Sequence, residues 1–176
     1  MLQIVTIAEE TGLKQPVDGL EAEQLLFRGV DPLELIRALF REYEEGLGEN
    51  LCFQSFSAEL ENPLKKYGPP GGCLLLAVFD GEPAGCAAFT PMADAGACEM
   101  KRLYVRPGFR AHGIAAALVR DLLDQAVAAG YRVMRLDTLE RLQPAIRLYE
   151  RFGFKRIEAY YENPLAEVVY MEKRFE

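Results

Sequence analysis

One short segment, residues 110–115, contains residue types that can bind an anion. Its sequence is Arg-Ala-His-Gly-Ile-Ala. The segment lies between a strand-like apolar run and a long helical pattern. The first turn of a helix leaves about four backbone N–H groups without intrahelical partners, and the helix dipole adds partial positive charge there. Gly113 lets a ligand approach the backbone, and Arg110 can donate charge-assisted hydrogen bonds. The segment therefore fits a phosphate or pyrophosphate site without metal, or a plain strand–helix turn in which Gly113 only relieves crowding.

Glu99 is a second candidate, because it is a carboxylate in a strand-like run that is otherwise largely apolar. A carboxylate among apolar neighbours accepts a proton more readily than one in water. Glu99 can therefore serve as a base, directly or through water. Lys101 lies two residues along, on the same face of a strand, so a structural ion pair is the alternative. The sequence leaves both interpretations open.

Two motifs in this chain resemble those of the GNAT N-acetyltransferase superfamily. Arg110-x-x-Gly113-x-Ala115 is similar to that superfamily's R/Q-x-x-G-x-G/A motif, and residues 145–154 are similar to its second motif. Both motifs occur in the family's order and spacing, and the resemblance spans residues 73–173. Two other phosphate loops are excluded, because the sequence has no GxxxxGK[ST] and no GxGxxG after a strand.

The resemblance implies acetyl-coenzyme A as co-substrate, held chiefly by backbone groups. It places the pyrophosphate on the loop and the pantetheine along the preceding strand, at Leu103 and Val105. The implied pyrophosphate contacts are Arg110, Ala111, His112, Gly113, Ile114 and Ala115. His112, the only histidine, is expected to contribute its backbone, with an incidental side chain. One histidine cannot form a histidine-based metal site, so no metal is expected.

Acetyl transfer to an amine needs a proton acceptor, an oxyanion donor and a proton for the departing thiolate, since an alkyl ammonium has a pKa of about 10.4. The resemblance assigns these roles to Glu99, the Leu103 backbone N–H and Tyr149. A β-bulge is expected to free that N–H. Tyr149 also belongs to an apolar stripe at helical spacing, so a core position is its alternative role. Leu142 stands where relatives often have a cofactor-binding asparagine, so that amide contact is lost or replaced.

The elements that must position these residues follow from apolar periodicity and turn residues. Asp31-Pro32 predicts the start of a helix that ends near Gly46 or Gly48, and Asp80-Gly81 predicts a tight hairpin. Residues 51–70 remain ambiguous. The predicted strands are 2–7, 73–79, 84–90, 97–105, 132–137, 155–159 and 168–173, and the predicted helices after the first are 111–129 and 144–152. Hairpins followed by a β-α-β unit predict an α/β (α+β) fold, with a mixed, mostly antiparallel sheet flanked by helices.

Length and composition indicate one domain over residues 1–176, expected in the cytoplasm, and the resemblance implies that this domain is an N-acetyltransferase (GNAT-like) domain. The net charge of −7 argues against a nucleic-acid partner, the apolar runs are too short for a membrane span, and the four cysteines show no disulfide pattern. The sequence leaves a homodimer open.

The acceptor is expected to be a small-molecule or peptide amine. The first 90 residues carry 15 acids and 6 bases, which favours a cationic amine steered by Glu42, Glu44, Glu45 and Glu49; those four can equally be a solvated helix end. Residues 160–164 can line its pocket or form a turn that packs two tyrosines. A catalytically silent coenzyme-A-binding regulator is the alternative function.

Overall fold

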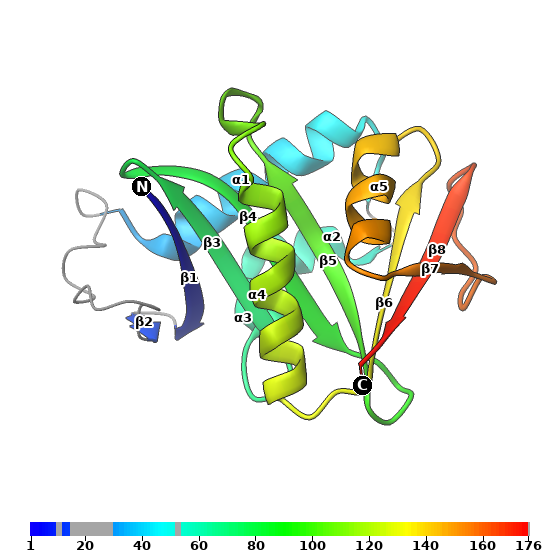
Figure 1. Ribbon diagram of the computed structural model, residues 1–176. Coiled ribbons are helices and arrows are strands. Elements are labelled where there is room, and N and C mark those ends of the chain that lie inside the picture. The colour runs from blue at the N-terminus through cyan, green and yellow to red at the C-terminus, as the bar shows by residue number, and fades with distance from the viewer. Residues whose placement is uncertain (10–11, 15–29, 52–53, 176) are drawn as a thin grey trace.

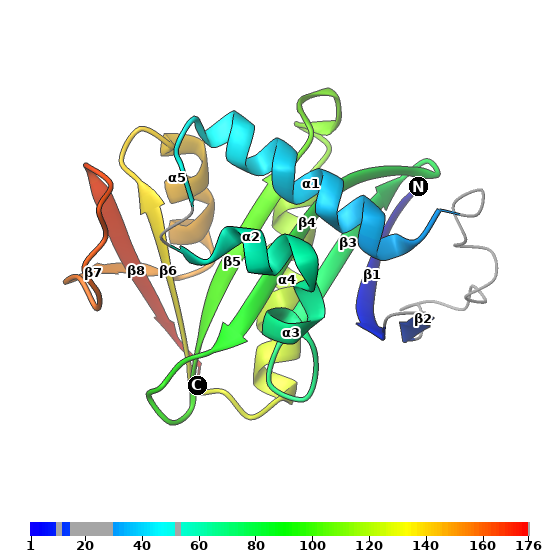
Figure 2. The same cartoon turned by 180° about the vertical axis from the view of Figure 1, so that it is seen from behind.

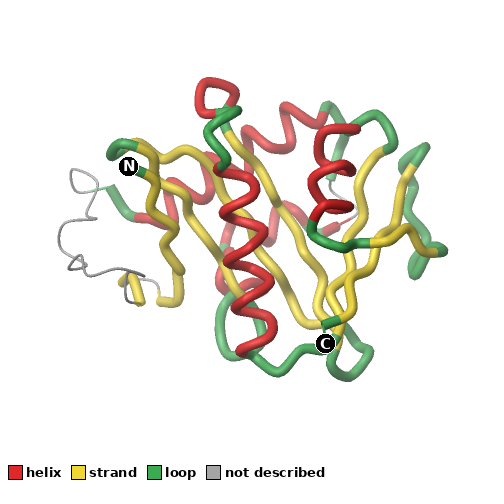
Figure 3. The backbone as a smooth tube through the Cα atoms, in the orientation of Figure 1, coloured by secondary structure: helices red, strands yellow, loops and turns green. Residues whose placement is uncertain are grey.

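A mixed sheet of eight strands runs through the protein (Figures 1 and 3). The computed structural model describes residues 1–9, 12–14, 30–51 and 54–175. The spatial order is β2-β1-β3-β4-β5-β6-β8-β7, and β5 and β6 form the parallel pair among antiparallel neighbours. The strands are β1 Leu2–Glu9, β2 Gly12–Lys14, β3 Cys73–Phe79, β4 Glu82–Pro91, β5 Ala97–Val105, β6 Val133–Leu139, β7 Lys155–Ile157 and β8 Val168–Arg174. The predicted fold class is confirmed.

Helices cover both faces of this sheet. α4 (Ile114–Ala128) and α5 (Gln143–Arg151) lie on one face, in front in Figure 1. α1 (Pro32–Leu47), α2 (Phe56–Glu61) and α3 (Pro63–Tyr67) lie on the other, as Figure 2 shows. Each face buries an apolar core, one under α4 and α5 and one under α1 to α3. Burial of apolar surface on both faces is what holds these layers together.

Local sequence rules explain the element ends. The Asp31 side chain accepts a hydrogen bond from the Leu33 N–H at 2.9 Å, Pro32 opens α1, and Gly48 closes it with a φ of 69°. Asp80 and Gly81 both have positive φ, 50° and 81°, which is the two-residue hairpin turn that Asp-Gly predicts. These predictions are confirmed.

Helix α4 begins at Ile114, three residues later than predicted. Ala111 and Gly113 have φ values of 66° and 75°, which a right-handed helix does not allow. The loop therefore extends further than apolar periodicity alone indicated. The ambiguous stretch contains α2 and α3, and Cys52 within it falls outside the described residues.

Two irregularities of β5 create the site. Its parallel ladder with β6 contains three residue pairs and ends at Glu99 opposite Arg135, so the described strands part beyond that point. On its other edge, the register with β4 shifts between Cys86 and Ala88, and Arg102 takes a φ of 60°. This is a β-bulge, with two residues of β5 opposite one of β4.

Candidate active site

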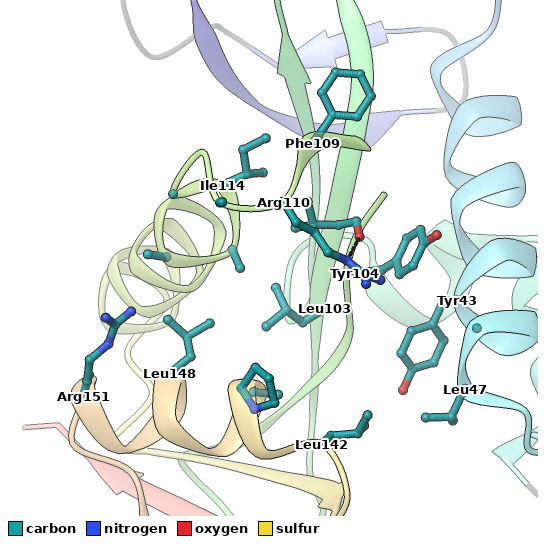
Figure 4. A pocket seen from close by; sticks show the side chains of 18 residues that line it. Tyr43, Leu47, Leu103, Tyr104, Phe109, Arg110, Ile114, Leu142, Leu148 and Arg151 are labelled. Atoms are coloured by element: carbon teal, nitrogen blue, oxygen red, sulfur yellow. Dashed lines mark hydrogen bonds between the residues drawn. The ribbon is translucent and has the colours of Figure 1, made fainter. Parts of the chain in front are cut away.

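A cavity of about 720 Å³ lies at the carboxyl end of β5 (Figure 4). The end of that strand, the loop before α4, the side of α5 and the last turns of α1 enclose it. Its apolar wall includes Leu103, Val105, Ile114 and Leu148, with Tyr43 facing them from α1. A largely apolar cleft with a few convergent polar groups is typical of a ligand site.

The backbone amides of residues 111–116 have no acceptor within the described part of the chain. The Arg110 N–H bonds to the Pro107 carbonyl at 3.3 Å, and the next amide with an intramolecular partner is that of Ala117, bonded to Gly113 at 3.0 Å. Five of the six residues between them line the large cavity; His112 does not. Unpaired amides at a helix start bind anions, so this loop keeps the chemistry that its sequence suggested.

Two arginines add positive charge at the same cavity. Arg110 donates from Nε to the Val105 carbonyl at 3.2 Å (dashed in Figure 4), and Arg151 reaches the cavity from α5. Neither has an ion-pair partner among the described residues. Both guanidinium groups are therefore free to pair with phosphate.

His112 points its ring away from this chemistry. Its Nδ1 lies 2.9 Å from the Arg110 carbonyl oxygen, an acceptor, which places a proton on Nδ1. The ring packs against Phe79 with centroids 4.8 Å apart. The structure thus gives the imidazole a local structural role at an exposed position.

Leu103 lies in the β5 bulge, the irregularity that the family resemblance implied near this residue. Its side chain lines the large cavity and also a second cavity of about 80 Å³. The preceding residue, Arg102, is buried, and its guanidinium bonds to both oxygens of Glu59 in α2, at 2.8 and 2.9 Å. Burial alone would raise the pKa of Glu59, but the Arg102 charge and hydrogen bonds hold it below its usual value. This pair fixes the bulge against α2.

The small cavity brings Tyr149 close to the β5 bulge. Tyr149 and Leu103 both line it, together with Lys101, Asp137 and Tyr43. Burial, followed by the charges of Tyr43 and Asp137, raises the pKa of Tyr149, so its hydroxyl keeps its proton at neutral pH. Its ring packs edge-on against Phe154 at 5.9 Å. Tyr149 therefore has a buried ring and also lines a cavity, and its role as proton donor stays a prediction.

Glu99 is held in an ion pair with Lys101, the structural arrangement weighed above. Its Oε1 lies 3.2 Å from Lys101 Nζ, and its Oε2 accepts a 2.6 Å hydrogen bond from the Tyr160 hydroxyl. Lys101 Nζ also lies 3.1 Å from Asp137 Oδ1, and Tyr161 donates to Asp137 Oδ2 at 2.9 Å. We call Glu99, Lys101, Asp137, Tyr160 and Tyr161 the Lys101 cluster.

The electrostatics of the Lys101 cluster favour a charged lysine and neutral tyrosine hydroxyls. Burial alone would lower the pKa of Lys101, but Asp137 and Glu99 raise it above the ordinary value. Burial, followed by the charge of Glu99 and its hydrogen bond, raises the pKa of Tyr160. Burial, followed by the charge of Asp137 and its hydrogen bond, raises that of Tyr161. The loop that carries both tyrosines therefore covers a largely buried, charged part of the sheet.

Most of the glutamates proposed to steer an amine have intramolecular partners. Glu42 pairs with Arg106 at 2.7 Å, Glu44 accepts from the Leu51 N–H at 3.1 Å, and Glu49 lies 3.4 Å from Arg141. Their first role is therefore to fix the end of α1. Glu45 is exposed.

The cysteines described, Cys73, Cys86 and Cys98, are buried free thiols. Burial raises the pKa of Cys73 and of Cys98 to about 12. No helix among the described residues is long and apolar enough to cross a membrane. The same residues contain no group of His, Cys, Asp or Glu side chains arranged to hold a metal ion.

Sequence reasoning missed Tyr43, Arg151 and Asp137. Tyr43 comes from α1, so only the tertiary fold brings it to the cavity. Arg151 follows Pro144 and Leu148 at helical spacing, a signal that could have been used. Asp137 was treated only as the end of a strand.

Comparison with known proteins agrees with this arrangement. Residues 33–154 match the acetyltransferase (GNAT) family. An uncharacterised N-acetyltransferase of Schizosaccharomyces pombe is 46% identical over 140 residues, which cover 79% of this chain and 86% of that protein. N-acetylaspartate synthetase of Homo sapiens is 35% identical over 114 residues, covering 61% of this chain and 38% of its own length.

Solved structures share the fold. A GNAT acetyltransferase of Staphylococcus aureus superposes with a TM-score of 0.72 at 16% identity and full coverage of both chains. A GNAT acetyltransferase of Elizabethkingia anophelis, solved with acetyl-CoA bound, superposes with a TM-score of 0.51 at 23% identity, over 60% of this chain and 77% of that one. The family match, the close fission-yeast relative and this fold lead to one conclusion: the chain belongs to the acetyltransferase (GNAT) family.

Proposed function

We propose that this protein is an N-acetyltransferase that moves an acetyl group from acetyl-CoA to a primary amine by direct attack in a ternary complex. The observation that carries the proposal is the row of unpaired amides at residues 111–116, which lines a cavity leading to Leu103. The residues fit the co-substrate, because amides and the Arg110 and Arg151 guanidinium groups suit a diphosphate. Pantetheine, a slim chain with amide groups, suits the β5 edge that β6 leaves unpaired.

The reaction then needs the following bond changes at the junction of the two cavities. The amine nitrogen attacks the thioester carbonyl carbon and forms the C–N bond. The carbonyl oxygen takes the negative charge, and the Leu103 N–H donates to it. The C–S bond breaks, and the thiolate takes the proton of the Tyr149 hydroxyl; the resulting phenolate takes a proton from the new amide nitrogen. Holding both substrates together supplies much of the remaining rate.

The acceptor is a cationic amine, in line with the net −1 formal charge of Glu99, Lys101 and Asp137 beside the small cavity. The name of the human relative makes aspartate an acceptor to test as well. A net negative site opposes a dicarboxylate, so we expect aspartate to be a poor acceptor.

A panel of primary amines with acetyl-CoA and free-thiol detection tests the proposal. Thiol release that depends on an added amine, with a matching rise in acetylated amine by mass spectrometry, is the expected result. Acetyl-CoA binding without turnover on any amine would instead support a catalytically silent coenzyme-A-binding regulator. Failure to bind acetyl-CoA at all would contradict both functions.

A further inference from the structure

The small cavity adjoins the large one where the reaction must occur. They share four lining residues: Tyr43, Leu103, Leu142 and Ala145. At about 80 Å³ the small cavity has room for two or three waters of about 30 Å³ each. A group bound there therefore touches most of its walls at once, including the bulge and Tyr149.

Asp137 is the carboxylate that lines this cavity. Glu99 is not among its lining residues in the described chain, although both acids pair with Lys101. The backbone explains the difference. Glu99 stands opposite Arg135, where β5 and β6 are still paired, whereas Asp137 lies two residues further along β6, beyond the point where the strands part. Arg102, which also lines the cavity, is paired with Glu59.

Asp137 also has capacity left for another donor. It accepts from Lys101 Nζ at 3.1 Å, the Tyr161 hydroxyl at 2.9 Å and the Asn163 side-chain amide at 3.2 Å. A carboxylate offers about four acceptor positions, so one remains. Asp137 and Glu99 together carry two negative charges, and Lys101 neutralises one of them. One negative charge is left for an incoming ammonium to neutralise.

We infer that Asp137, rather than Glu99, binds the acceptor ammonium and takes its first proton; this inference rests on the proposed function. One N–H bond of R–NH₃⁺ breaks, the proton passes to an Asp137 oxygen, and its electron pair stays on nitrogen. The neutral R–NH₂ then attacks the thioester carbon. After product release Asp137 returns the proton to water, so acetyl-CoA and R–NH₃⁺ give the acetamide, the coenzyme A thiol and H⁺.

Matched amide variants test this assignment. Asp137→Asn and Glu99→Gln each remove one carboxylate from Lys101, so their structural costs are comparable. At saturating acetyl-CoA we expect Asp137→Asn to lower kcat/KM for the amine by about 100-fold or more, and Glu99→Gln by less than about tenfold. The Kd of acetyl-CoA, measured by calorimetry, should change by no more than about threefold in either, because neither carboxylate lines the large cavity that contains the loop amides.

A second pair keeps the test valid if Asp137→Asn fails to fold. Tyr161→Phe removes the hydroxyl that donates a hydrogen bond to Asp137, and Tyr160→Phe removes the hydroxyl that donates one to Glu99. Both variants retain both carboxylates. We expect Tyr161→Phe to lower kcat/KM for the amine more than Tyr160→Phe does.

The outcomes separate this inference from the function beneath it. An active wild-type enzyme in which Glu99→Gln loses as much as Asp137→Asn, or Tyr160→Phe more than Tyr161→Phe, would overturn the assignment and leave the N-acetyltransferase function intact. A wild-type protein that binds acetyl-CoA but acetylates no amine would overturn the proposed function, and the role of Asp137 with it.

Discussion

At the scale of single residues, Tyr149 carries the sharpest prediction. Tyr149→Phe removes one hydroxyl and keeps the ring that packs on Phe154, so kcat should fall about 100-fold while the KM for acetyl-CoA changes little. Steady-state kinetics measure this, and the melting temperature should shift by no more than a few degrees. A full rate in the phenylalanine variant would show that the thiolate receives its proton elsewhere.

Motifs shared with the family pointed to part of the candidate site. The family resemblance pointed to the loop 110–115, Leu103 and Tyr149, and the structure places all of these except His112 at two adjoining cavities. The sequence could not distinguish Glu99 as a base from Glu99 as an ion-pair partner of Lys101. Both interpretations need Glu99 and Lys101 on the same face of one strand, which is all that their spacing predicts. The presence of Asp137 beside Lys101 depends on how β6 leaves β5, and no local pattern encodes that separation.

At the scale of elements, the loop before α4 depends on a left-handed backbone at Gly113. Any side chain there is strained at a φ of 75°, although the space around it is open. Gly113→Ala should therefore cost about 1 to 2 kcal/mol of stability and weaken acetyl-CoA binding by tilting the amides. Denaturant unfolding and calorimetry measure the two effects.

Gly108 provides the matched control in the same loop. An added Cβ there meets no atom within 4 Å, and its φ is not positive. Gly108→Ala should leave both stability and acetyl-CoA affinity within error of the wild type. Equal losses in the two variants would show that the backbone of Gly113 has no special role.

The β5 bulge depends on α2 through the Arg102–Glu59 pair. Glu59→Gln leaves a buried guanidinium without its counter-charge and should destabilise the protein by about 3 to 5 kcal/mol. Arg102 lowers the pKa of Glu59 in the folded state. The contribution of the Arg102–Glu59 pair to the free energy of unfolding is therefore present above the unfolded-state pKa of Glu59 and is lost as the pH falls through its folded-state pKa. Urea unfolding at pH 7 and at acidic pH measures both. Glu61→Gln, exposed on the same helix, should change stability by less than about 0.5 kcal/mol.

Elements were more predictable than their exact ends. β5 matches its predicted range, and capping residues located both ends of α1. The start of α4 was missed because alanine has high helix propensity, whereas Ala111 takes a left-handed φ that the loop imposes. The short helices α2 and α3 carry too few turns for a clear period.

At the scale of the whole molecule, buried tyrosines add to the loss of stability at alkaline pH, together with the buried thiols. Burial raises the pKa of Tyr43, Tyr67, Tyr149, Tyr160 and Tyr161 above the ordinary value. As the pH rises, these hydroxyls lose their protons in the unfolded chain before they do so in the folded protein. The contribution of the neutral tyrosines to the free energy of unfolding is therefore complete below about pH 10 and is lost as the pH rises further. Chemical unfolding at pH 8 and above pH 10 should show a marked fall in the free energy of unfolding. A constant value would mean that these hydroxyls ionise as easily in the fold as in water.

The proposed function depends on one interaction that spans the molecule: unpaired amides at residues 111–116 hold the diphosphate of acetyl-CoA, and β5 guides the thioester to Leu103 and Tyr149. A crystal structure of the complex with coenzyme A tests it most directly. We predict diphosphate oxygens within hydrogen-bonding distance of those amides and the thiol beside the β5 bulge. A diphosphate bound elsewhere, with the loop amides bonded to other groups of the protein, would contradict the claim.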